Sequence, residues 1–89
     1  MGKVALTFRI LPDSTEVDLN QLVGVIQTHL PKGAKWNGFK TTPFAYGLTA
    51  IQCAIIIEDA EGGADNVQEA LEKVEQVQGV ELIDMGRLM

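Results

Sequence analysis

The sequence predicts a single α+β domain whose elements run strand, helix, strand, strand, helix, strand. Three observations predict it: an alternating apolar stretch near the N-terminus, a β-rich stretch at residues 48–58, and two segments that each carry one apolar stripe at helical spacing. The 89 residues, 46% of them hydrophobic, suffice for one hydrophobic core and not for two. We therefore expect one folded domain over residues 1–89.

The first strand is expected over residues 3–11, because apolar side chains occupy every second position there. Asp18 and Gln21 then have the spacing of a capping box at a helix start. The helix should end near residue 30, before Pro31 and Gly33. Its apolar stripe is formed by Leu19, Leu22, Val23, Ile26 and Leu30.

The second strand, residues 34–42, should be irregular. Trp36 and Phe39 stand at opposite parity with Gly38 between them, which indicates a bulge or aromatic rings on both faces. The third strand, residues 48–58, has apolar side chains at both parities. Such a strand is buried on two sides, so we expect it in the middle of the sheet.

A second helix is expected from Asp65, which can cap it together with Gln68, to a stop at Gly79. A short last strand should follow at residues 80–87. Two helices with one apolar stripe each must cover the same face of one sheet, and right-handed crossovers then give a ferredoxin-like split βαβ sandwich. Its four-stranded antiparallel sheet would carry both helices on one face, in the order βαββαβ.

The net charge of −5 disfavours contact with phosphate backbones and anionic lipid over the chain as a whole. Residues 1–45 carry a net charge of +2 and residues 46–89 a net charge of −7. The longest apolar run, residues 53–57, is far shorter than a membrane-spanning helix, and no secretion signal begins the chain. We expect a cytoplasmic protein that binds neither nucleic acid nor membrane directly.

Enzyme chemistry has few candidate residues. Cys53 stands alone inside a strand and reads as a small core residue, while His29 lies in a last helical turn where a surface role is expected. No nucleophile–base pair or metal-ligand cluster is evident, so we expect no catalytic residue, no metal and no cofactor. Gly62 and Gly63 could form an anion nest, but their acidic neighbours favour a solvated turn.

The sequence lacks the residues of two other functions that this topology supports. An acylphosphatase needs an anion-cradling loop with an arginine after the first strand, where this chain has Asp13 and Glu16. An RNA-recognition module needs exposed aromatic rings on the first and third strands, whereas Phe8 falls on the face expected under the helices. Both interpretations are therefore weak.

Two residues are not explained by the core. Tyr46 follows Pro43 and precedes Gly47 at the mouth of a strand, and Arg87 lies two residues from the end of the sequence. The simpler interpretations are that Tyr46 packs on Phe44 and shields the end of the sheet, and that Arg87 belongs to a flexible tail.

These residues belong to motifs that carry a family resemblance. The stretch Pro43-Phe44-Ala45-Tyr46-Gly47-Leu48, the acidic glycine loop at residues 58–63 and the ending Gly86-Arg87-Leu88-Met89 resemble archaeal elongation factor 1-beta sequences over the whole chain, and Trp36 stands at that family's distance before the aromatic-glycine pair. The resemblance implies a ferredoxin-like fold and catalysed GDP release from a partner GTPase, elongation factor 1-alpha, without covalent chemistry.

The resemblance also implies the site. In the eukaryotic members an aromatic ring at the position of Tyr46 enters a pocket of the GTPase, and a lysine near the carboxyl terminus reaches toward the magnesium and phosphate site. Arg87 occupies the lysine position, and Met89 is one extra terminal residue. The implied partner-binding residues are Phe44, Tyr46, Gly47, Arg87 and Leu88.

The alternative is a small-molecule sensor of the ACT kind, which shares the same element order. Such a sensor would need a ligand loop between the first strand and the first helix, typically with a glycine, and residues 12–17 contain none. Sheet edges of this fold can pair, but nothing in the sequence compels a dimer, so we expect a monomer.

Overall fold

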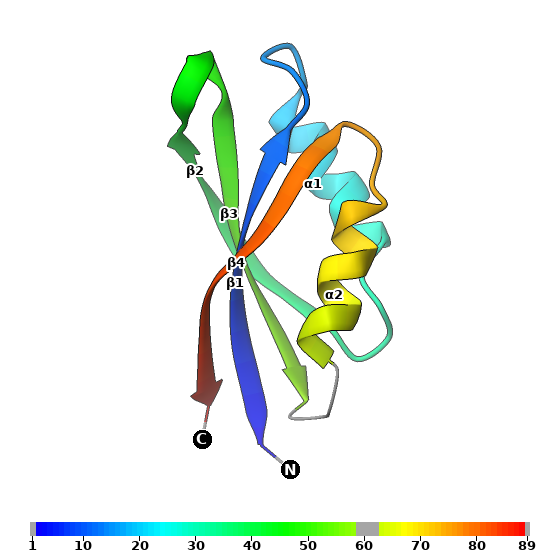
Figure 1. The fold of residues 1–89 in the computed structure, drawn as a ribbon. Coiled ribbons are helices and arrows are strands. Elements are labelled where there is room, and N and C mark those ends of the chain that lie inside the picture. Colours follow the sequence, from blue (N-terminus) through cyan, green and yellow to red (C-terminus); the bar gives the residue numbers. More distant parts are fainter. Residues whose placement is uncertain (1, 59–62, 89) are drawn as a thin grey trace.

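The computed structural model describes residues 2–58 and 63–88 and shows the expected α+β sandwich (Figure 1). Its strands form one antiparallel sheet in the order β2-β3-β1-β4. This is the ferredoxin-like arrangement that the sequence predicts, with β3 inside the sheet. The elements are β1 (Lys3–Pro12), α1 (Leu19–Thr28), β2 (Lys35–Pro43), the short 3-10 turn η1 (Ala45–Gly47), β3 (Thr49–Glu58), α2 (Gly63–Glu72) and β4 (Val77–Leu88).

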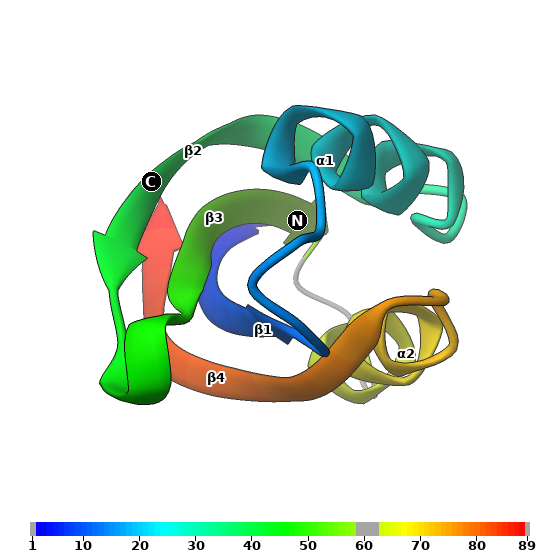
Figure 2. The same cartoon turned by 90° about the horizontal axis from the view of Figure 1, so that it is seen from above.

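Both helices lie on the same side of the strongly curved sheet, as Figures 1 and 2 show. The core fills the space between them and the sheet, because alternate residues of β1 and β3 point toward the helices. Phe8 is completely buried there, so it offers no ring to stack on RNA bases. The core is formed by Val4, Leu6, Phe8, Ile10, Leu22, Val23, Ile26, Ile51, Cys53, Ile55, Ile57, Val67, Leu71 and Val74.

Helix α1 begins where the capping signal predicts. The Asp18 carboxylate accepts hydrogen bonds from the backbone N–H groups of Asn20 at 3.0 Å and Gln21 at 3.3 Å. The helix ends at Thr28, two residues before the expected end, and His29 caps it with its backbone N–H donating to the carbonyl oxygen of Ile26 at 3.0 Å. His29 is exposed, in agreement with a surface role.

The irregularity predicted for the second strand is present as a bulge. The register of β2 against β3 shifts between Trp36, opposite Ile55, and Phe39, opposite Cys53. Gly38 takes φ 112 inside the bulge, a conformation that a residue with a Cβ rarely adopts. The extra residue brings both rings to the same face of the sheet, where their centres lie 6.1 Å apart.

The predicted end of the second helix is wrong. Helix α2 spans Gly63–Glu72, so Asp65 lies inside its first turn, and the helix ends seven residues before Gly79. A tight turn follows, in which Gln76 takes φ 71 and its carbonyl oxygen accepts the backbone N–H of Asp13 at 2.8 Å. The left-handed Gln76, and not Gly79, thus ends the turn after α2. Gly79 belongs to the 12-residue strand β4, where it pairs with Leu11.

The glycine pair before α2 is described at Gly63 alone, since Gly62 and residues 59–61 of the acidic loop lie outside the described residues. A Cβ added to Gly63 would come within 2.7 Å of the Ile57 Cδ1. The missing side chain therefore lets the helix start pack closely against β3. Within residues 2–58 and 63–88, no helix has the length and apolar character needed to cross a membrane.

Cys53 is fully buried in the core, as the sequence predicts. Loss of hydration on burial raises the pKa of its thiol from an ordinary value of 9.0 to about 11, against the opposing effect of backbone hydrogen bonds. The unfolded chain therefore releases this proton at a lower pH than the folded chain does. The contribution of Cys53 to stability is complete below pH 9 and is lost as the pH rises toward 11.

We expect the free energy of unfolding to fall by about 2 kcal/mol between pH 8 and pH 10.5 through this group. Urea denaturation at the two pH values measures the change. The Cys53→Ala variant has no thiol to titrate, so its stability should fall less over the same interval. Parallel pH profiles for the two proteins would show that the thiol does not titrate as described.

Candidate partner-binding site

The connection from β2 to β3 is a compact five-residue turn. The backbone N–H of Phe44 donates to the carbonyl oxygen of Leu48 at 2.8 Å, and the N–H of Leu48 donates to the carbonyl oxygen of Ala45 at 3.2 Å. Inside the turn, two residues with left-handed backbone angles reverse the chain. They are Tyr46 at φ 62 and Gly47 at φ 77. Gly47 adopts such an angle freely, whereas tyrosine does so at a cost.

Tyr46 is presented to solvent on this turn, with 94% of its surface exposed. A ring that packed on Phe44 and shielded the end of the sheet would be covered, so the simpler interpretation of this residue is wrong. The backbone angle of Tyr46 and the exposure of its ring are both unfavourable for an isolated protein. Strained residues of this kind are concentrated at binding and switch sites.

The strain gives a direct prediction for stability. Replacing Tyr46 by glycine should raise the free energy of unfolding by about 1 kcal/mol, because glycine occupies the left-handed region without a Cβ clash. Tyr46→Ala keeps the Cβ and should leave stability close to that of the wild type. Urea denaturation of the three proteins measures the difference, and equal stability of the two variants would contradict the strain.

Phe44 anchors the turn to the sheet face opposite the helices. Phe44 as a whole residue is 37% exposed, and the guanidinium carbon of Arg9 lies 5.4 Å from its ring centre. Arg9, in β1, also forms an ion pair with Glu81 of β4. The sequence offered no signal for these contacts, because the alternation of β1 places Arg9 on the open face and says nothing about which side chains meet it there.

Arg87 and Leu88 lie far from this turn. They are the last described residues of β4, where Arg87 pairs with Val4 and Leu88 with Lys3. Lys3 in turn faces Glu58, at the opposite end of β3 from Thr49 and the turn. Val4 pairs with Ile57, so Arg87, Val4 and Ile57 form one row across the sheet. Eight residue steps of extended strand, from Thr49 beside the turn to Ile57, separate this row from the turn by about 26 Å. Figure 1 shows the start of β1 and the end of β4 at the end of the sheet away from η1.

The structure thus joins Phe44, Tyr46 and Gly47 in one turn and separates them from Arg87 and Leu88. Because Arg87 is part of β4 and pairs with Val4 of β1, its backbone is not part of a free tail. The molecule measures 41 Å along its longest axis and 20 Å and 18 Å across. A partner that contacts both groups must therefore meet them at two separate places.

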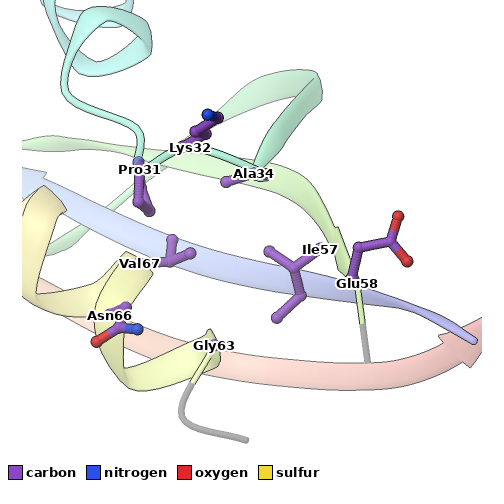
Figure 3. A pocket seen from close by; sticks show the side chains of 9 residues that line it. Pro31, Lys32, Ala34, Ile57, Glu58, Gly63, Asn66 and Val67 are labelled. Carbon is purple, nitrogen blue, oxygen red and sulfur yellow. The ribbon is translucent and has the colours of Figure 1, made fainter. Parts of the chain in front are cut away.

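A cavity of about 250 Å³ opens beside Ile57 and Glu58, at the end of β3 away from the turn (Figure 3). Its walls come from the α1–β2 connection, the end of β3 and the first turns of α2, with Lys32, Glu58 and Asn66 as polar groups. The loop between β1 and α1, where an ACT-like sensor would hold its ligand, contributes none of the described lining residues. The cavity therefore gives that alternative no support.

The described residues contain few groups suited to metal chemistry. Across residues 2–58 and 63–88, no three histidine, cysteine or acidic side chains gather closely enough to hold a metal ion. No buried side-chain nitrogen or oxygen atom among them lacks a hydrogen-bond partner. The features that distinguish the β2–β3 turn and the adjoining sheet face are the exposed Tyr46 and the contact between Arg9 and Phe44.

Comparisons with known proteins agree with this architecture and extend it. The fold resembles the ACT domain from the GTP pyrophosphokinase of Chlorobium tepidum, with a TM-score of 0.62 at 18% identity over 91% of this chain and 99% of that domain. At this identity the likeness concerns the fold alone.

Similarity in sequence is much closer to another group. The chain is 42% identical to elongation factor 1-beta of Methanobrevibacter smithii, over the full length of both proteins. It is 41% identical to elongation factor 1-beta of Haloarcula marismortui, over 99% of this chain and all of that protein. Residues 5–88 match the family described as the EF-1 guanine nucleotide exchange domain. The chain therefore belongs to the EF-1 guanine nucleotide exchange domain family.

Proposed function

We propose that this protein is a guanine-nucleotide exchange factor that promotes GDP release and GTP loading on elongation factor 1-alpha. Family membership over residues 5–88 and full-length similarity to archaeal elongation factor 1-beta proteins support this function. The structural observation that carries the mechanism is Tyr46, an exposed ring on a strained turn. The protein acts by binding and performs no covalent chemistry.

The physical task of such a factor is to stabilise one state of its partner. A GTPase holds its nucleotide through phosphate contacts and a bridging magnesium ion. An exchange factor lowers the barrier to release only if it binds the nucleotide-free, metal-poor state more tightly than the nucleotide-bound state. The residues that act must therefore gain their contacts when the nucleotide leaves.

Tyr46 suits this task as a wedge. Its ring is exposed in the free protein, so burial in a pocket of the partner contributes about 1.5 to 3 kcal/mol of hydrophobic stabilisation. The turn is closed by two backbone hydrogen bonds, so little backbone freedom remains to be lost on binding. The same two hydrogen bonds hold Tyr46 at its left-handed angle in the absence of the partner.

Arg87 supplies the positive charge of the mechanism. A guanidinium directed at the vacated metal position replaces part of the charge that the magnesium ion provided, and it forms charge-assisted hydrogen bonds with phosphate oxygens. Its guanidinium is planar and permanently charged, whereas the lysine of the eukaryotic members is a compact point charge. Leu88, the next residue of β4, is the second proposed partner-binding residue of this end.

The Tyr46 turn and the Arg87 end of β4 lie about 26 Å apart along the sheet, so one site on the partner cannot bind both. The Tyr46 turn and the Arg87 end engage two regions of the GTPase, with the rigid sheet between them. Binding at the turn then brings the guanidinium to its target at a high effective concentration. The sheet acts as the spacer of this bidentate contact.

Stopped-flow release of a fluorescent GDP analogue from an archaeal elongation factor 1-alpha tests the function. Catalytic amounts of this protein should accelerate release, and the rate should saturate as its concentration rises. Bovine serum albumin at the same concentration serves as the control. An off-rate that stays unchanged at saturating amounts of this protein would refute the proposed function.

A further inference from the structure

We propose that Arg9 is a positioning residue for the Tyr46 turn, held in place by Glu81 of β4. This proposal rests on the proposed exchange function and adds to it a residue outside the turn and outside the C-terminal end. Arg9 lies in the middle of the sheet, and it touches the turn through Phe44 alone among the contacts described.

The contact has a defined geometry. The guanidinium carbon of Arg9 lies 5.4 Å from the centre of the Phe44 ring, within the range of a cation–π interaction. Phe44 is also the residue whose N–H closes the turn onto Leu48. A side chain that fixes the Phe44 ring therefore fixes the first residue of the turn relative to the sheet.

Glu81 binds the same guanidinium. Arg9 and Glu81 face each other across β1 and β4, and their side chains form an ion pair. The side chain of Arg9 is 37% exposed and that of Glu81 is 59% exposed. An ion pair this accessible to water adds little to overall stability. What it can do is restrict the orientation of a long side chain that would otherwise sample many rotamers.

We therefore expect the loss of Arg9 to affect binding much more than folding. Without the guanidinium, the Phe44 ring and the turn above it gain freedom that must be lost again when the partner binds. The loss of order at one or two side chains should raise the half-saturating concentration in the exchange assay about 3- to 10-fold. The maximal exchange rate at saturation should stay the same, because Tyr46 and Arg87 are intact.

The chain offers a matched control for charge. Lys40 of β2 faces Gln52 of β3, and Gln52 in turn faces Arg9, so the three residues share one row on the open face. Lys40→Met and Arg9→Met each remove one positive charge from that row and leave an apolar stem. Only Arg9→Met removes the contact with Phe44. Arg9→Lys keeps the charge opposite Glu81 but loses the planar group, so it should restore part of the affinity.

A second readout follows the turn without the partner. Tyr46 is the only tyrosine in the sequence, so fluorotyrosine incorporated during expression places a single fluorine label at the tip of the turn. We expect Arg9→Met to shift and sharpen the fluorine resonance, as the turn becomes more mobile, while Lys40→Met leaves the resonance unchanged. The melting temperature of Arg9→Met should stay within about 8 °C of the wild-type value.

The outcomes separate the possibilities. A raised half-saturating concentration together with a changed fluorine resonance supports the positioning role. A raised half-saturating concentration with an unchanged resonance would make Arg9 a direct contact of the partner, and an equal loss in Lys40→Met would reduce the effect to general charge. Either result overturns the proposal. If the wild-type protein fails to accelerate GDP release, the exchange function fails, while the fluorine resonance still reports whether Arg9 orders the turn.

Discussion

Truncation of Tyr46 to alanine is expected to slow catalysed GDP release about 10- to 100-fold at a fixed, subsaturating concentration of the factor. The estimate follows from the loss of about 1.5 to 3 kcal/mol of burial free energy in the complex with the partner. Tyr46 is 94% exposed in the free protein, so removal of its ring takes away almost no intramolecular contact. The fold should survive, and stopped-flow release of a fluorescent GDP analogue measures the loss.

The matched control for this variant is Tyr46→Phe. It keeps the ring and the left-handed turn and removes the hydroxyl group alone, so its exchange rate should stay within about 3-fold of the wild-type rate if the ring acts by apolar burial. The defect of Tyr46→Ala should persist at every magnesium concentration, since the wedge does not bind the metal. Wild-type rates for Tyr46→Ala across a magnesium titration would show that the ring plays no part.

Replacement of Arg87 by alanine is expected to slow exchange about 10-fold at millimolar free magnesium, since one charge-assisted interaction contributes about 1.5 kcal/mol or more. The defect should shrink as free magnesium is lowered. When little metal is bound, the GTPase needs less help to reach its metal-poor state. GDP release measured across a magnesium titration therefore distinguishes this residue from Tyr46.

Arg87→Lys is the conservative control, and it restores the residue type of the eukaryotic members. It retains the positive charge and should recover most of the exchange rate, with a loss of bidentate hydrogen bonding. A defect of Arg87→Ala that is independent of magnesium would exclude a role for Arg87 at the metal position. It would leave Arg87 as an ordinary contact of the interface.

Much of the fold is readable from the sequence because its signals are local. The alternation in β1, the cap at Asp18 and the parity conflict around Gly38 each depend on neighbouring residues, and the structure confirms all three. The prediction for the second helix failed because it relied on the nearest glycine as a stop. The chain turns instead at Gln76, whose left-handed backbone is held by a hydrogen bond from Asp13, distant in sequence.

The candidate site was readable to a lesser degree. Proline and glycine around Tyr46 indicate a turn, but the exposure of the ring and its backbone angle depend on how the turn closes in three dimensions. The contact of Arg9 with Phe44 joins residues 35 positions apart, and no local pattern encodes it. The separation of Tyr46 from Arg87 likewise follows from strand register, which is a property of the whole sheet.

The length of β3 has a consequence for how this molecule can change. One added residue in β3 would turn every following side chain to the other face, so its length can change without inverting the faces only in steps of two residues. Such a step in β3 alone would leave its neighbours β1 and β2 out of register. The distance between the two ends of the domain can therefore change only in steps of two residues, and only if the neighbouring strands change length together. A partner that contacts both ends of the domain is therefore fitted to one fixed distance. Sequence changes in either protein that altered this distance would disrupt one of the two contacts.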